Sequence, residues 1–545
     1  MSLPQALADL RDVLAGLRFP LSLPGADTAT AAARAVRNQL DDYLIPRLAK
    51  IDAPLLVVTG GSTGAGKSTL VNSIVGEPIS PVGARRPTTR EPVLVCHPDD
   101  AAWFRRASKL SRIEERTSLP PGLALLDTPD IDSVEEANRL LAEQLLAGAD
   151  LWLFVTTAVR YADAVPWELL TDARDRGTTV AIAFNRVPPA AEEEVVPHLA
   201  EMITEHGLRT TKTFVVLEQP LDRYGLLPPA AIAPMKDWLT VLARSAAERS
   251  AVIRQTLDGA LAALAPALDR LAEQATAQST ALRALGESVD LSYREAESEV
   301  AQAVSDGVLF RGEVLTRWQE LAGTGDFMRG LQTRVGRLRD RVVSALSGKP
   351  VPVEQLKSAL ESGVVTLIHS AAADAAERAA NAWRAHPAGS ALLKPGLAEA
   401  TPGIEDRADR TMRDWQRAVL ELVRDESSKK LYFAKVSAYA VNGLGLCLMI
   451  AVFAATAFIP TGAEIAVAGG TTIAAQKVLE AIFGDDAVRR LAEKARQDLL
   501  SRVAVLLGQE AQRFHVVLAD TAVDPEAAQR LRDAASAIDR QRSAR

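Results

Sequence analysis

The chain contains 545 residues, of which 48% are hydrophobic and 24% are charged, and this balance excludes an intrinsically disordered protein. A length of 545 residues predicts more than one domain, because single domains usually hold about 50–250 residues. The formal net charge of −7 excludes a nucleic-acid-binding protein built on a strongly basic body, so no nucleic-acid partner is expected.

The N-terminal part of the chain alternates between helical and extended patterns. A helix is predicted over residues 31–50, and a buried strand is predicted to begin at Leu55. Similar short apolar runs follow at 92–96, 123–126, 151–156, 180–184 and 214–217, separated in most cases by helix-compatible stretches. This alternation predicts a mostly parallel α/β sheet. We therefore expect an N-terminal helical region at 1–50 and an α/β domain at 51–245.

A glycine-rich loop follows the first predicted strand and precedes a predicted helix. It reads G-S-T-G-A-G-K-S and matches the phosphate-binding pattern G-x-x-x-x-G-K-[S/T] in full. Its glycines let the backbone curve around phosphates, and amides at the helix N-terminus donate to them. Lys67 is predicted to act on the β- and γ-phosphates, and Ser68 to bind Mg²⁺. The predicted nucleotide-binding residues of this loop are Gly61, Ser62, Thr63, Gly64, Ala65, Gly66, Lys67, Ser68 and Thr69.

A polar loop at residues 85–92 reads R-R-P-T-T-R-E-P. A threonine here can close over the γ-phosphate and complete the Mg²⁺ coordination in the triphosphate state only. We predict Thr89 for this catalytic and metal-binding role, with Thr88 as the alternative. The arginines of the loop either offset transition-state charge or form plain surface charge.

An aspartate ends the apolar run at 123–126. Asp127 follows Lys67 by about sixty residues and begins the sequence D-T-P-D. A P-loop fold needs a carboxylate at this strand end for the water shell of Mg²⁺. Asp127 is therefore the third predicted metal-binding residue, beside Ser68 and Thr89.

From about residue 246 the sequence becomes rich in alanine and leucine. Apolar residues recur at steps of four and three, as at Leu257, Leu261, Leu264, Leu268 and Leu271. This spacing predicts a long helical bundle with an intramolecular core, which we favour over an intermolecular coiled coil. We expect helices over 246–430, a hydrophobic hairpin at 431–485 and returning helices over 486–545.

The segment from Val436 to Ala463 contains no charged residue. A helix of about 20 such residues can cross a bilayer. A Pro-Thr-Gly turn at 460–462 and lysines and arginines on both flanks predict a hairpin with both ends on the cytoplasmic side of the cell membrane. We favour membrane insertion over the alternative, a hairpin buried in the bundle core. The predicted lipid-contacting residues are Val436, Leu444, Leu446, Leu448, Ile450, Phe453, Phe458 and Ile459.

Two further patterns concern the location of the chain and the absence of a zinc-binding motif. The first residues, MSLPQALADLRDVL, lack the basic and apolar regions of a signal peptide, so a chain facing the cytoplasm is expected. The six histidines form no pair at the spacing of a zinc-binding helix, which excludes a zinc hydrolase of that type.

The phosphate loop, the P-T-T-R-E-P loop, the L-D-T-P strand end and the long helical region with its apolar hairpin together resemble bacterial members of the dynamin superfamily. The matching motifs cover roughly residues 55–190. The resemblance implies a GTPase head joined through a helical neck and trunk to a membrane-binding tip at Val436–Phe483, with GTP and Mg²⁺ as ligands. It also implies membrane lipids as partners, and pairing of two heads of this chain or of a paralogue. Lys67, Ser68, Thr89 and Asp127 would be its phosphate and magnesium residues.

The sequence departs from this family at the base-recognition motif [N/T]-K-x-D. The fitting position reads Asn185-Arg186-Val187-Pro188. Asn185 and Arg186 are predicted to bind the nucleotide, Arg186 by covering the base with its stem, whereas Pro188 offers no carboxylate for guanine. ATP therefore stays an alternative to GTP.

The family's water-positioning groups are also missing. Thr63 and Gly64 replace a glutamine and a serine, and Asp130 replaces a switch glycine. Slow hydrolysis, or a different water-positioning group, is expected.

The leading hypothesis is therefore a dynamin-like GTPase that couples GTP hydrolysis to membrane remodelling. The alternatives are a membrane-anchored regulatory GTPase that acts through a protein effector, and a soluble P-loop scaffold that binds nucleotide. The motifs above are compatible with all three.

Overall fold

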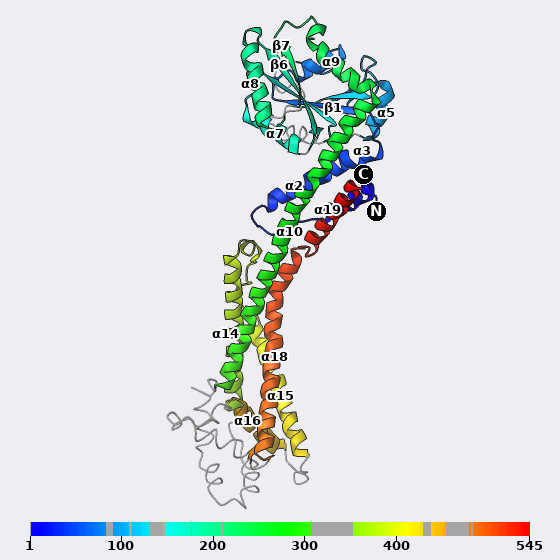
Figure 1. Cartoon of the computed structure of the whole chain (residues 1–545). Coiled ribbons are helices and arrows are strands. Elements are labelled where there is room, and N and C mark those ends of the chain that lie inside the picture. The colour runs from blue at the N-terminus through cyan, green and yellow to red at the C-terminus, as the bar shows by residue number, and fades with distance from the viewer. Residues whose placement is uncertain are drawn as a thin grey trace, which may run out of the picture. The chain divides into compact units, whose positions relative to one another are not determined.

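The computed structural model describes residues 2–82, 91–107, 112–129, 145–146, 148–175, 177–208, 211–306, 353–428, 438–453, 479–480 and 483–544. The chain divides into two compact units, and each is described by itself (Figure 1). The first, here called the sheet unit, comprises Met1–Phe19, Pro24–Gln278 and Asp524–Arg545. The second, the bundle unit, comprises Pro20–Leu23 and Ser279–Val523.

The sheet unit contains a seven-stranded sheet in the order β3-β2-β4-β1-β5-β6-β7. Its strands pair in parallel except β2 with β4, which confirms the predicted mostly parallel α/β sheet. The short β3 was not predicted from the sequence. The strands are β1 Leu55–Gly61, β2 Val93–Cys96, β3 Ile113–Glu115, β4 Leu123–Asp127, β5 Leu151–Thr157, β6 Thr179–Val187 and β7 Lys212–Leu217.

Helices cover both faces of this sheet, and each face has its own apolar core. Successive residues of β5 alternate between the cores, with Leu153 in one and Trp152 and Phe154 in the other. The first core also receives α4 and α9, and the second α5, α7 and α8. Burial on both faces explains why these strands read as continuous apolar runs. The helices are α4 Lys67–Val75, α5 Pro98–Ala107, α7 Ala164–Asp175, α8 Glu192–Glu205 and α9 Pro229–Arg244, with a 3-10 turn at Pro189–Ala191.

A third core of the sheet unit is entirely helical. It combines the two ends of the chain with the first part of the long helix α10, and α1 and α19 pack directly on each other. Figure 1 accordingly shows the two chain ends close together. Leu257, Leu261, Leu264, Leu268 and Leu271 are buried here, which confirms the predicted intramolecular stripe. The elements are α1 Leu3–Gly16, α2 Ala26–Gln39, a π-helical turn Leu40–Leu44, α3 Ile45–Ala49, α10 Ala246–Ser305 and α19 Ala527–Ser543.

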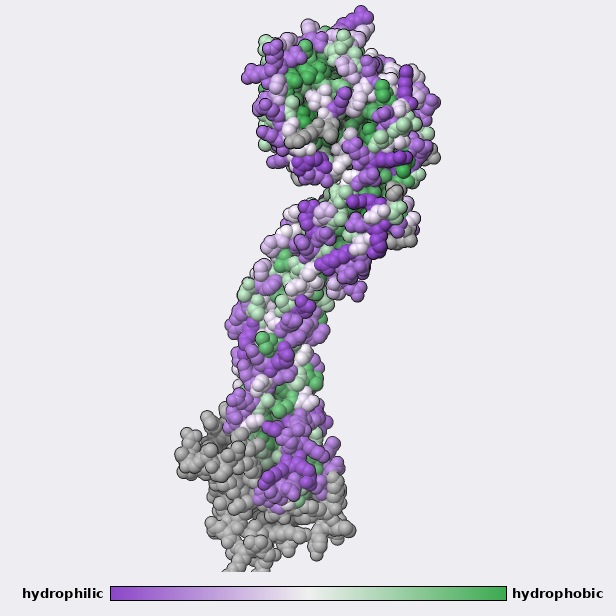
Figure 2. Space-filling model, viewed as in Figure 1, coloured by the Kyte–Doolittle hydropathy of each residue, from purple (hydrophilic) through white to green (hydrophobic). Residues whose placement is uncertain are grey.

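The bundle unit is formed by long helices around one core. The part of α10 after Gln278 packs here with α14 Val353–Ala385, α15 Ile404–Ser428, α16 Ala438–Phe453 and α18 Asp485–Asp520, and a 3-10 turn lies at Ser390–Leu392. Alanines such as Ala372, Ala376 and Ala379 line α14 and allow close helix packing. On the face shown in Figure 2, hydrophilic residues predominate over the surface of these helices.

The described part of the predicted membrane hairpin lies in this core. Leu448, Ile450 and Phe453 of α16 have no exposed surface, and the Phe453 ring meets Trp415 edge-on at a centroid distance of 5.6 Å. The expectation that these three side chains contact lipid is therefore not met in this conformation, because other helices already cover them. The buried-helix alternative describes α16. No helix among the residues described here is long and apolar enough to cross a membrane.

The other predicted lipid-contacting residues are not covered by the structure. The side chains of Leu444 and Leu446, and all of Val436, Phe458 and Ile459, lie outside what is described.

A candidate nucleotide site at the carboxyl edge of the sheet

The phosphate loop connects β1 to α4, as predicted. The close packing of the loop explains two of its glycines. A Cβ on Gly61 would lie 2.1 Å from the backbone oxygen of Val155, and a Cβ on Gly66 would lie 2.5 Å from Asn185 Nδ2. Gly66 also has a φ of 92°, in the left-handed region that side chains disfavour. A side chain at Gly61 would displace β5, and a side chain at Gly66 would displace Asn185 of β6.

Lys67 folds back across the loop. Its Nζ donates to the backbone oxygens of Gly61 at 2.8 Å and Ser62 at 3.2 Å, and the side chain is buried. The ammonium group is thereby held at the loop, within the element predicted to bind phosphates. Its action on the β- and γ-phosphates stays a prediction.

Two side chains from neighbouring strands contact the loop at further carbonyl groups. Asn185, near the end of β6, donates from Nδ2 to the Ala65 oxygen at 2.8 Å. Arg160, in the turn after β5, donates from Nη1 to the Thr63 oxygen at 3.0 Å. The strands run in parallel, so the ends of β1, β5 and β6 meet at one edge of the sheet. The structure thus brings Asn185 to the loop, and its binding of a nucleotide stays a prediction.

Arg186 lies on the same side of the loop as Asn185. Its Nε would be 3.7 Å from a Cβ built on Gly66, and its backbone φ of 52° is unusual for a residue other than glycine. The side chain is exposed. Its predicted cover of a base stays a prediction.

One amide of the loop is used internally. The Ala65 N–H donates to the Ser62 oxygen at 3.1 Å, and the backbone of Leu70 donates to Gly66 at 2.9 Å. The Ala65 amide is therefore already satisfied within the loop. The helix N-terminus at Lys67 keeps the geometry that favours an anion.

The predicted Mg²⁺ ligands that the structure describes are Ser68 and Asp127. Asp127 ends β4, is fully buried, and pairs in register with Thr59 of β1, two residues before Gly61. Thr128 donates from Oγ1 to the Thr59 oxygen at 2.7 Å and fixes this strand exit against β1. A hydroxyl and a carboxylate are oxygen donors of the kind that Mg²⁺ prefers, so the donor set fits the ion. Thr89 and Thr88 lie outside the described residues.

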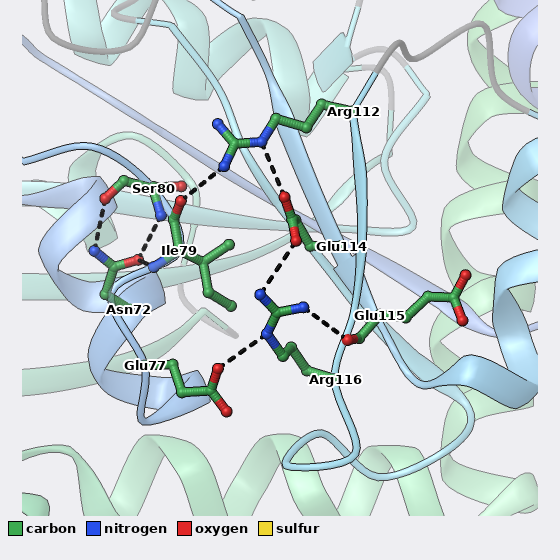
Figure 3. A network of polar contacts seen from close by, with 8 residues as sticks. All are labelled: Asn72, Glu77, Ile79, Ser80, Arg112, Glu114, Glu115 and Arg116. Carbon is green, nitrogen blue, oxygen red and sulfur yellow. Dashed lines mark hydrogen bonds and ion pairs between the residues drawn. The ribbon is translucent and has the colours of Figure 1, made fainter.

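A polar network anchors the segment that leads from α4 toward the loop containing Thr89 (Figure 3). Asn72 of α4 donates from Nδ2 to the Ser80 oxygen at 2.8 Å, and its Oδ1 accepts the backbone N–H groups of Ile79 at 3.0 Å and Ser80 at 2.8 Å. Arg112 donates to the Ile79 oxygen at 3.1 Å. The residues before this loop are therefore tied to the helix that begins at Lys67.

The same network continues along β3. Arg116 contacts Glu77 at 3.0 Å and Glu114 at 3.2 Å, and Arg112 contacts Glu114 at 3.1 Å (Figure 3). These groups are partly exposed, so they position the segment more than they stabilise the fold.

A buried ion pair lies at the opposite edge of the sheet. Arg47 of α3 pairs with Asp150, which precedes β5, and also donates to the Pro54 oxygen at 2.8 Å. Asp150 accepts from the Leu56 backbone at 2.7 Å, and its own carbonyl accepts from Thr256 of α10 at 2.8 Å. Burial raises the pKa of the Asp150 carboxyl, and the Arg47 guanidinium opposes this rise. The pair fastens α3 and α10 to the amino ends of β1 and β5.

Arg160 is the residue of this site that the sequence analysis missed. A position-based signal existed, because Arg160 follows the end of a strand adjacent to β1. Its residue type gave no signal, since arginines on polar loops are common.

Part of the chain is similar to known proteins. Residues 56–117 match the family described as "Dynamin family". This part of the chain is therefore dynamin-like. Over 122 residues it is 28% identical to a probable transmembrane GTPase, FZO-like and chloroplastic, from Arabidopsis thaliana, which covers 22% of this chain and 13% of that protein. It is 29% identical over 148 residues to GTPase Era of Actinobacillus pleuropneumoniae, which covers 26% of this chain and 42% of Era.

The chain matches these relatives over less than half of their own length. A solved structure of an oligomerised bacterial dynamin pair aligns with 96% of this chain and 96% of its own, at 12% identity and a TM-score of 0.42.

Proposed function

We propose that this dynamin-like chain binds GTP with Mg²⁺ at the phosphate loop, hydrolyses it, and couples the nucleotide state to membrane binding by the bundle unit. The observation that carries the nucleotide part is the hydrogen bond from Asn185 to Ala65. It joins the residue expected to recognise the base to the loop expected to bind the phosphates. Base and phosphate recognition then belong to one site.

Different residues of the site would supply the hydrogen-bond donors, the positive charge and the metal ligands for a triphosphate. The loop amides and the N-terminus of α4 supply fixed donors and a positive dipole end, and Lys67 adds a full charge. Ser68 and Asp127 would hold Mg²⁺. When bound, the ion would offset the charge on the phosphate oxygens. A triphosphate is therefore favoured over uncharged ligands.

The base preference is tested by competition. GTP and ATP are each used to displace a fluorescent GTP analogue from the purified full chain. We expect GTP to displace it at the lower concentration, because Asn185 and Arg186 stand at the position of the guanine-recognition motif [N/T]-K-x-D. Tighter binding of ATP would overturn the assignment to GTP.

The membrane part of the proposal is supported by the uncharged segment at 436–463 and its cationic flanks. Because Leu448, Ile450 and Phe453 are covered by protein, lipid contact is assigned to residues of the segment other than these three. We propose a location at the cytoplasmic face of a membrane, with lipid as a partner.

Flotation with liposomes tests this assignment. A chain carrying Phe458→Glu and Ile459→Glu should lose flotation, since two charges oppose entry into hydrocarbon. The matched control is Val505→Glu on α18, where the native side chain is 62% exposed. If the double variant floats like the control, these residues do not contact lipid.

Pairing of two chains is the remaining element of the proposal. It is supported by the family of the GTPase domain and by the oligomeric state in the description of the bacterial dynamin pair. Turnover per molecule should rise with protein concentration if catalysis needs two chains. A flat response would favour a GTPase that acts through a protein effector.

A second candidate function is a nucleotide-binding protein that does not insert into membranes. The burial of Leu448, Ile450 and Phe453 in the bundle core favours it. It predicts that wild-type chain stays unbound to liposomes both with and without GTP.

A further inference from the structure

The carbonyl groups of the phosphate loop have side-chain donors at four positions. Lys67 contacts the oxygens of Gly61 and Ser62, Asn185 contacts that of Ala65, and Arg160 contacts that of Thr63. Lys67 and Asn185 belong to the motifs already discussed. Arg160 belongs to none of them, yet it makes the same kind of contact.

The contact at Thr63 fixes the direction of a neighbouring donor. In a planar trans peptide the C=O of one residue and the N–H of the next point in opposite directions. The Thr63 oxygen faces Arg160, so the N–H of Gly64 points away from it. Gly64 belongs to the glycine-rich loop predicted to bind phosphates, so its amide is a candidate donor to them. Asn185 acts on the Ala65–Gly66 peptide in the same manner.

Arg160 is itself held in place. Its Nε donates to Asp163 Oδ2 at 2.9 Å, and the backbone N–H groups of Arg160 and Tyr161 donate to the Thr157 oxygen at 3.0 and 2.9 Å. The turn after β5 is therefore closed by its own hydrogen bonds. Asp163 fixes one edge of the planar guanidinium while Nη1 contacts the loop, a geometry that a lysine does not reproduce in full.

We propose that Arg160 is a positioning residue of the nucleotide site, which aims the Gly64 amide by holding the Thr63 carbonyl. The proposal rests on the proposed function in that the anion at this loop is the phosphate chain of GTP. It assigns Arg160 to binding through the loop backbone, not to direct contact with the nucleotide.

The test is a comparison of three full-length chains in titrations with fluorescent GTP and GDP. Arg160→Ala should weaken both by about ten-fold, the effect of losing one charge-assisted hydrogen bond. Arg160→Lys should restore affinity to within about three-fold, because an ammonium still donates to a carbonyl. Arg174→Ala is the matched control: Arg174 also binds an aspartate and a backbone oxygen, with 37% side-chain exposure against 35% for Arg160, but it lies just before the amino end of β6.

Two further measurements separate positioning from general damage. The melting temperature of Arg160→Ala should equal that of Arg174→Ala, and its turnover at saturating GTP should stay within about two-fold of wild type while KM rises. Asp163→Ala, which releases the guanidinium without removing it, should weaken binding by about three-fold.

The outcomes are distinct. Equal affinities of Arg160→Ala and Arg174→Ala, while wild type binds GTP, would overturn the role of Arg160 and leave the proposed function intact. Unchanged affinity with lost turnover would also overturn it, because the arginine would then act on the reaction. A wild-type chain that binds no GTP would overturn both proposals.

Discussion

The phosphate loop and helix α16 are both short, glycine-containing segments that stand out in the sequence, and their structures are determined in different ways. In the loop, polar backbone groups must find partners, and Lys67, Arg160 and Asn185 supply them at set positions. In α16 the backbone is satisfied within the helix, so its apolar side chains can be covered by lipid or by protein alike. Local polar chemistry therefore predicts a structure more closely than apolar composition does.

Removing the partner of a buried charge gives the largest expected effect. Arg47→Ala leaves Asp150, which has no exposed surface, without its guanidinium. We expect the free energy of unfolding of the sheet unit to fall by about 4 kcal/mol at pH 7. The loss should shrink at lower pH, because the protonated carboxyl is neutral. Chemical denaturation at pH 7 and at a lower pH measures this loss of stability. A loss below about 1 kcal/mol at pH 7 would show that the Arg47 partner of Asp150 contributes little to the fold.

The packing of α16 is tested by Phe453→Ala. This ring is fully buried against Trp415, so its removal should cost the bundle unit about 3 kcal/mol in lipid-free solution. Leu291→Ala is the control, since Leu291 is 53% exposed on α10. Equal denaturation midpoints for the two variants would show that α16 does not belong to the core.

The variant Lys67→Ala tests the polar contacts of the phosphate loop. Loss of this charge should reduce turnover by about 100-fold, as for removal of one preorganised donor. The Gly61 and Ser62 residues are buried and their carbonyls lose a donor, so the melting temperature should also fall. Steady-state GTP hydrolysis and thermal melting provide the two measurements. Substantial turnover in this variant would contradict the predicted role of Lys67.

A carboxylate inside the bundle unit gives the smallest expected effect. Burial raises the pKa of Glu510, but hydrogen bonds from Thr401, Arg407 and Arg513 outweigh it and lower the pKa below its ordinary value of 4.5. A lowered folded-state pKa adds stability that is fully present above about pH 4.5 and is lost as pH falls below it.

Glu510→Gln should therefore cost about 1 kcal/mol at pH 7 and flatten the acid limb of the stability curve. Melting temperatures between pH 7 and pH 3 provide the measurement. An acid limb as steep as that of wild type would assign the pH dependence to other groups.

The sequence predicted the parts of the site that follow from strand ends. Asp127 and Asn185 each close an apolar run, and parallel pairing brings such ends to one edge. Arg160 was not predicted, because its contact depends on the conformation of the turn after β5, and an arginine on a polar loop is too common to mark a site. β3 was missed because its three residues, Ile113–Glu115, are too short and too polar to form a pattern.

The sequence predicted that this region is helical, but it did not predict which helices pack together. The leucine stripe of α10 marks a buried face, yet the same stripe suits any apolar neighbour. The structure places it in one apolar core with α1 and α19, at the two ends of the chain. For α16 the composition was compatible with two environments, and Trp415 and its neighbours, far away in sequence, provide the observed one.

The packing of α19 on α1 has a consequence for how the chain is made. Leu7 and Leu10 near the start share one apolar core with Leu531 and Ile538 near the end. A ribosome releases the first pair before the second, with the bundle-unit residues Ser279–Val523 translated in between. Helix α1 can pack on α2 and α3 before α19 is made, but its contact with α19 forms only afterwards, so a nascent chain stopped before Asp524 should be a preferred substrate for chaperones and proteases.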